Sequence, residues 1–92
     1  MKVKQGHTKF KVVAYEPGKI EGYDDRHLAV VYTCMATRVK RSSKTVHYTT
    51  EGGYYMAHEN YWNNRLFSTR RKALQEAQRR IDEINKAIEG TL

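Results

Sequence analysis

The hydrophobic and polar positions in the last third of the chain follow the period of an α-helix. Between residues 69 and 88, apolar side chains recur at steps of three and four, at Ala73, Leu74, Ala77, Ile81, Ile84 and Ile88. This spacing places them in one stripe, and the intervening residues are mostly Gln, Glu, Arg and Lys, which favour helix. Ser68 or Thr69 can accept a hydrogen bond from a free backbone N–H at the start. We therefore predict a C-terminal helix over about residues 69–88.

The preceding part of the chain has the short stretches that are typical of β-strands. Residues 10–15 (FKVVAY) end at a Pro17–Gly18 turn signal, and residues 28–35 are apolar on both faces and continue as an alternating segment to residue 40. Two further stretches follow at residues 44–50 (KTVHYTT) and 54–57. Ser42–Ser43 and Gly52–Gly53 predict tight turns, which join antiparallel neighbours. Asn63–Asn64 predicts another turn, after which residues 65–67 lead into the helix.

These elements predict an α+β fold. It would be a small antiparallel sheet, or a partly open barrel, of four to five strands, followed by one C-terminal helix that lays its apolar stripe on the sheet. The 92 residues suit one domain, in which we expect residues 1–8 to be loosely held. No apolar run approaches ~18 residues, and MKVKQGHTKF lacks the apolar segment of a signal peptide. We therefore expect a cytoplasmic protein with no membrane partner.

The charge of the chain indicates the class of partner that it binds. The chain has 17 Lys and Arg against 10 Asp and Glu, a net charge of +7, and residues 1–19, 36–50 and 65–80 carry most of the excess. A basic stretch is often only a solvated face, but a small domain must bring some of three such stretches together. We predict nucleic acid or an acidic surface of a nucleoprotein enzyme as the partner. The candidate contacts are Arg38, Lys40, Arg41, Lys44, Arg65, Arg70, Arg71 and Lys72.

The segment LFSTRRKALQEA (residues 66–77) resembles the closing element of small bacterial and phage β-domains, where a similar stretch follows the last strand and starts a helix. It is also similar to SH3-like phage proteins and to the arm-type DNA-binding domain of tyrosine-recombinase integrases. The latter resemblance implies a sheet that enters a DNA groove and no catalytic residue. Unlike those families, this chain has Lys72 where an acidic residue would complete the cap of the helix, after Arg70 and Arg71. Three cations at the positive end of a helix dipole favour an anion site there.

Aromatic residues gather just before the predicted helix. Adjacent residues of a strand point to opposite faces, so one of Tyr54 and Tyr55 is expected to be exposed. Exposed tyrosine or tryptophan beside arginine stacks on unpaired bases or anchors a protein interface, and the alternative is that these rings form the core. The candidate aromatic contacts are Tyr54, Tyr55, Tyr61 and Trp62.

The chain shows no pattern of an established catalytic site. The four histidines lack the spacing of a local metal site, no G-x-x-x-x-G-K-S/T loop is present, and Cys34 lies in the most apolar stretch, as expected of a buried and unreactive thiol. We expect no catalytic residue, no metal and no cofactor.

Three functions agree with these observations. The first is a non-enzymatic nucleic-acid-binding module, which uses the cationic hairpin and the helix N-terminus. The second is a phage or mobile-element inhibitor of a host defence or nucleic-acid enzyme, of the anti-CRISPR or anti-restriction type. The third is a metal-free ribonuclease, in which Lys, Arg, Tyr or His would act on the phosphate. The oligomeric state is open, and an unpaired edge strand would support a dimer.

Overall fold

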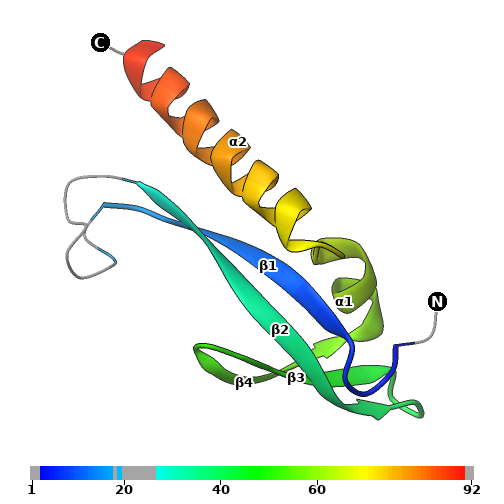
Figure 1. Ribbon diagram of the computed structural model, residues 1–92. Helices are drawn as coiled ribbons and strands as arrows, with labels where there is room; N and C mark the ends of the chain where they lie inside the picture. The colour runs from blue at the N-terminus through cyan, green and yellow to red at the C-terminus, as the bar shows by residue number, and fades with distance from the viewer. Residues whose placement is uncertain (1–2, 18, 20–26, 91–92) are drawn as a thin grey trace.

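The computed structural model describes residues 3–17, 19 and 27–90. Within this part of the chain, four strands precede two helices: β1 (Thr8–Tyr15), β2 (Leu28–Lys40), β3 (Thr45–Thr50), β4 (Gly53–His58), α1 (Glu59–Arg65) and α2 (Arg70–Gly90). The strands form one antiparallel sheet in the order β1-β2-β3-β4, and α2 runs beside β1 and β2 (Figure 1). The predicted α+β fold is confirmed, in its open-sheet form with four strands.

Helix α1 is the element that the sequence prediction missed. Residues 63–64 were expected in a turn, but the whole segment ENYWNNR is helical. The Nδ1 atom of His58 accepts a hydrogen bond from the Asn60 N–H at 3.1 Å, which caps the start of the helix. Trp62 is fully buried against the sheet, and this tertiary packing outweighs the local preference of asparagine for turns.

The start of the described chain contacts the core and strand β2. Val3 is buried in the core. The Gly6 N–H donates to the Ala36 carbonyl at 2.7 Å, and the Ala36 N–H donates to the His7 carbonyl at 2.8 Å. The expectation that residues 1–8 are loosely held stays a prediction, and residues 1–2 lie outside the described part. The predicted Pro17–Gly18 turn also falls partly outside it, at Gly18.

Two cores lie on opposite faces of the sheet. The α1 core comprises Val3, Cys34, Ala36, Val46, Tyr48, Trp62 and Leu66. The α2 core comprises Val12, Ala73 and Ala77, with Phe10, Ala29, Val31 and Phe67 partly buried around them. On β2, Val31 belongs to the α2 core and Cys34 to the α1 core, and residues three apart on a regular strand point to opposite faces. Burial at the centre of the α1 core raises the pKa of the Cys34 thiol to about 11, as expected of an unreactive thiol.

A β-bulge changes the direction of the side chains at the end of β2. The register pairs Ala36 with Tyr48 and Arg38 with His47, so Thr37 is the extra residue. Without it, Arg38 would point to the same face as Ala36 and Cys34, which are buried in the α1 core. The bulge instead sends Val39 toward the core and exposes Arg38 and Lys40 on the opposite face.

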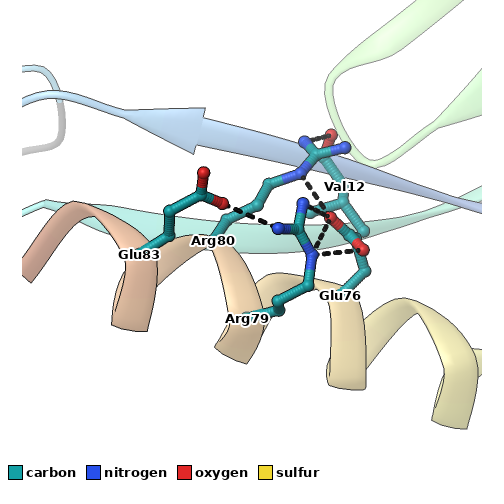
Figure 2. Close-up of polar contacts among 5 residues, drawn as sticks. All are labelled: Val12, Glu76, Arg79, Arg80 and Glu83. Atoms are coloured by element: carbon teal, nitrogen blue, oxygen red, sulfur yellow. Dashed lines mark hydrogen bonds and ion pairs between the residues drawn. The ribbon is translucent and has the colours of Figure 1, made fainter. Parts of the chain in front are cut away.

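Helix α2 is joined to the outer edge of β1 through polar contacts. Phe10 and Phe67 exchange two backbone hydrogen bonds, of 2.9 and 2.8 Å, just before the helix begins. One turn further than Ala77, the guanidinium of Arg80 donates to the Val12 carbonyl at 3.1 Å and to the Glu76 carboxylate at 3.2 Å (Figure 2). As predicted, Thr69 caps the helix, because its hydroxyl oxygen accepts from the Lys72 N–H at 3.2 Å.

Candidate nucleic-acid interface

The face of β2, β3 and β4 that α1 leaves uncovered forms a regular grid of nine side chains, which we call the open sheet face. The register aligns three rows across the strands, and alternation places all nine on the same side. The rows are Met35, Thr49 and Tyr54; Arg38, His47 and Met56; and Lys40, Thr45 and His58. Helix α2 covers this same side of the sheet only at β1 and the neighbouring part of β2.

Several large side chains of the open sheet face are well exposed. Tyr54 is 57% exposed, Met56 63% and Met35 46%. Arg38 and Lys40 are exposed as well, and none of the nine residues is acidic. The surface therefore combines apolar and aromatic groups with positive charge, and its cations lie along β2 while its most exposed apolar groups lie along β4.

His47 occupies the centre of the grid and contacts Tyr54 at the end of the first row. The Nδ1 atom of His47 and the hydroxyl of Tyr54 are hydrogen-bonded, and their ring centroids lie 5.7 Å apart at an interplanar angle of 35°. His47 belongs to β3 and Tyr54 to β4, so they hold each other in position across the two strands. A ring fixed in this way is better prepared to stack on a ligand than a free side chain, because less rotamer entropy is lost on binding.

Arg70 extends the positive charge of the open sheet face at the row before Met35. Its guanidinium donates to the Thr33 hydroxyl at 3.4 Å, and Thr33 lies two residues before Met35 on the same face of β2. The carboxylate of Glu51 accepts from the Thr33 N–H at 3.0 and 3.1 Å. Hydrogen bonds from backbone N–H groups, and to a lesser extent the charge of Arg70, hold the pKa of Glu51 below its usual value.

The remaining predicted cations lie in three other places. Arg41 and Lys44 are exposed in the turn between β2 and β3, and Lys44 has a positive φ of 54°. The Lys44 carbonyl accepts from the Glu59 N–H at 2.8 Å, which fixes this turn to the start of α1. Arg65 is exposed at the end of α1, and Arg71 and Lys72 are exposed in the first turn of α2. Of the three cations at the start of α2, Arg70 is the one that a described hydrogen bond places against the sheet.

Three of the four aromatic candidates belong to the other face. Trp62 is fully buried in the α1 core and packs at 5.6 Å from the ring of Tyr48, so its prediction as an exposed contact is wrong. Tyr61 is half-buried beside the same core. Tyr55 is 45% exposed, but it points away from the open sheet face and stacks on Tyr48 at 5.8 Å. Tyr54 alone of the four lies on the open sheet face.

A hollow of about 330 Å³ opens on the Tyr55 side, between the β1–β2 ladder and the turn from β3 to β4. Tyr15 and Tyr32 are joined there by a hydrogen bond of 2.9 Å between their hydroxyls, which is the main cause that raises the pKa of Tyr32 to about 12. The ammonium of Lys11 lies 5.9 Å from the ring centre of Tyr55 and 5.8 Å from that of Tyr61. Partial burial opposes its charge, but the hydroxyl of Tyr61 and other nearby groups outweigh this and raise the pKa of Lys11.

Met35, His47 and Met56 are members of the open sheet face that the sequence reasoning did not select. A signal for His47 was present, because it alternates with Val46 and Tyr48 in KTVHYTT and must point away from the core that they form. Met35 carried no such signal, since the stretch before it is apolar on both faces.

Searches of protein-family models, of curated proteins and of solved structures found no match to this chain. Neither of the described helices is both long and apolar enough to span a bilayer. Among residues 3–17, 19 and 27–90, no cluster of three or more His, Cys, Asp or Glu side chains could bind a metal ion.

Proposed function

We propose that this protein is a non-enzymatic nucleic-acid-binding module that holds a single-stranded segment on its open sheet face. The observation that carries the proposal is the composition of one uncovered surface, on which an exposed, hydrogen-bonded tyrosine of β4 faces the same side as Arg38 and Lys40 of β2, with no acidic residue in the grid. Aromatic rings stack on bases, and cations bind the phosphates that connect them.

The arrangement of the grid suits a chain that carries bases on one side and phosphates on the other. Neighbouring strands lie about 4.8 Å apart, so the cations of β2 and the apolar side chains of β4 are separated by about 10 Å. A single strand that follows β3 would place bases over Tyr54 and Met56 and phosphates near Arg38 and Lys40. Arg70 and the Arg41–Lys44 turn would extend the phosphate contacts at the two ends of this path.

The arginines near the middle of α2 contribute less to nucleic-acid binding than their number suggests. Arg79 is bound by Glu76 and Glu83, with N–O distances of 2.5 and 2.7 Å, and Arg80 is bound by Glu76 (Figure 2). These partners neutralise two cations of the basic stretch 65–80. The proposal therefore assigns nucleic-acid binding to Arg38, Lys40 and Arg70 and not to Arg79 or Arg80.

The decisive test compares two adjacent tyrosines in a fluorescence-anisotropy titration with labelled single-stranded DNA and RNA. Tyr54→Ala should weaken binding roughly five- to 150-fold, which corresponds to the loss of one stacked base at about 1–3 kcal/mol. Tyr55→Ala is the matched control, because it removes a similarly exposed ring from the opposite face and should leave the affinity unchanged. Equal affinities of the two variants, or no binding by the unaltered protein at low salt, would contradict the proposal.

A second comparison uses two arginines and the dependence of affinity on salt. For single strands, each phosphate contact contributes about 0.7 to the slope of log affinity against log salt concentration. Arg38→Gln should lower the slope by about that amount, whereas Arg79→Gln should not, since Arg79 is already paired with two carboxylates. An unchanged slope for Arg38→Gln would remove β2 from the interface.

The alternative of an inhibitor that docks on a protein is favoured by one observation. Met35, Tyr54 and Met56 expose apolar surface on one face, and methionine is well suited to protein-binding surfaces because it adapts its shape. Affinity capture from a nuclease-treated lysate separates the two functions. Retention of one stoichiometric protein partner, lost with Met56→Ala, would favour the inhibitor, and loss of all partners after nuclease treatment would favour nucleic-acid binding.

A further inference from the structure

The outer edge of β4 carries backbone groups that point away from the sheet. The Glu59 N–H donates to the Lys44 carbonyl, and hydrogen-bonded and non-hydrogen-bonded pairs alternate along an antiparallel ladder. Counting from this bond makes Tyr54, Met56 and His58 the residues whose N–H and C=O groups are directed away from β3. The His58 C=O, as the N-cap carbonyl, accepts from the backbone of α1. In the described part of the chain, no other element supplies a backbone hydrogen bond to the N–H and C=O groups of Tyr54 and Met56 or to the His58 N–H.

The other edge of the sheet is treated differently. On β1, the outward groups of Phe10 are bonded to Phe67, and the Val12 carbonyl accepts from Arg80. Sheet edges that must stay single are usually covered in this way or protected by proline, charged side chains or a bulge. Strand β4 (GYYMAH) has no proline, no Asp, Glu, Lys or Arg and a continuous register with β3, and it lies at the edge remote from α2 (Figure 1). Its edge is therefore open to another strand.

We propose that two copies of this chain pair through β4 in an antiparallel arrangement and form a continuous eight-stranded sheet. A two-fold axis beside Met56 would place Met56 opposite its own copy and Tyr54 opposite His58 of the second chain. Met56 would exchange two backbone hydrogen bonds with its own copy, and the His58 N–H of each chain would donate to the Tyr54 carbonyl of the other. Side chains of compatible type would meet across the junction. The pairing gives neighbours to Tyr54 and Met56, which are 57% and 63% exposed in the single chain.

The charge of the protein permits this pairing. The opposed β4 segments carry no formal charge, so no like charges face each other at the junction. The cations Arg38 and Lys40 lie on β2, which is five strand spacings, or about 24 Å, from β2 of the second copy. This distance exceeds the Debye length of about 8 Å at physiological ionic strength, so repulsion between the two cationic columns is largely screened.

The register can be tested with cysteine substitutions. In a hydrogen-bonded antiparallel pair the Cα atoms lie about 5.5 Å apart, which is within the range of a disulfide, so Met56→Cys should form a covalent dimer under mild oxidation. Tyr54→Cys is the matched control on the same strand and face, because its two copies would lie about 15 Å apart and should cross-link roughly ten-fold more slowly. The native Cys34 is fully buried and should not react. Non-reducing electrophoresis gives the rates, and circular dichroism checks the fold of each variant.

Equal rates of cross-linking for the two variants would overturn the proposed register, and sedimentation of the unaltered protein as a monomer at every concentration would overturn the dimer. Neither measurement contains nucleic acid, so failure of this inference is distinguishable from failure of the proposed function. If both hold, the two open sheet faces lie side by side across the axis, and a dimer offers one binding surface of twice the width.

Discussion

The two helices cover opposite faces of the sheet, and they hold to it by different means. Helix α1 has seven residues and is anchored by one large side chain, Trp62, which is fully buried with Tyr48 and Val46. Helix α2 has 21 residues, but its buried residues are two alanines, Ala73 and Ala77. Burial energy is therefore concentrated in one residue of the short helix and spread thinly over the long one.

This difference decides which surfaces remain uncovered. Helix α1 closes the side of the sheet at β3 and β4 that bears Val46 and Tyr48, and α2 closes the other side at β1 and β2. Each helix leaves part of its own side of the sheet uncovered. On the side of α2 this part is the open sheet face, and on the side of α1 it is the tyrosine-lined hollow. A sheet of four strands with two helices on the same side would have offered one bare face, whereas this arrangement offers two smaller ones.

The largest expected effect comes from removing the anchor of α1. Trp62→Ala should lower the free energy of unfolding by about 3–5 kcal/mol, because it empties the centre of the α1 core. Urea denaturation followed by circular dichroism measures the change. The less severe Trp62→Phe should cost clearly less, since the indole N–H has no hydrogen-bond partner in the described structure and only volume is lost. A loss below 1 kcal/mol for Trp62→Ala would show that α1 is not held by this residue.

The next effect tests the close approach of α2. Ala73 is fully buried against β1, and a larger side chain has no room there, so Ala73→Leu should destabilise the protein by about 1–3 kcal/mol through overpacking. Gln75→Leu is the matched control, since it makes a similar change on the exposed side of the same helix. Equal stabilities of the two variants in urea would indicate that α2 lies further from the sheet than described.

Helix α2 and the four strands, which follow from the periodic spacing of apolar residues, were predicted well from the sequence. The stripe of apolar residues gave α2 to within two residues at its end, and alternation with tight turns gave all four strands. Helix α1 was missed because its seven residues are too few for two full periods of the pattern, and its stability comes from Trp62 in a tertiary contact.

The candidate site was predicted less completely, for a related reason. Arg38, Lys40 and Tyr54 were selected from the sequence, but their presence on one surface depends on the strand register and on the bulge at Thr37. Neither can be read from residue types, because a shift of one position would have turned the same cations toward the core. Trp62 was wrongly expected to be exposed because α1 was not predicted. It was assigned to an extended segment, whereas it is the buried anchor of that helix.

A smaller effect on stability should distinguish Arg80, which contacts β1, from Arg79, which does not. Arg80→Ala removes the hydrogen bond to the Val12 carbonyl and should lower the free energy of unfolding by about 1 kcal/mol, as for one partly exposed hydrogen bond. Arg79→Ala removes only contacts within the exposed face of the helix and should cause no measurable loss. Thermal unfolding of both variants under identical conditions makes the comparison, and equal shifts in Tm would mean that the contact with β1 does not hold the helix.

The smallest expected effect concerns the contact that joins the two halves of the sheet. Glu51 lies in the turn from β3 to β4 and accepts from the Thr33 N–H of β2, and backbone N–H groups hold its pKa below the ordinary value of 4.5. A carboxylate whose pKa is lowered by folding stabilises the folded state above the unfolded value, and this stabilisation disappears as the pH falls through the folded pKa. Glu51→Gln should therefore be less stable than the unaltered protein at neutral pH, and the difference should shrink as the pH falls below about 4.5. Hydrogen bonding to Arg79 lowers the pKa of Glu76 too, so the variant keeps part of the acid dependence. Urea midpoints measured from neutral to acid pH test this, and two parallel curves would show that Glu51 remains equally ionised in the folded and unfolded chains.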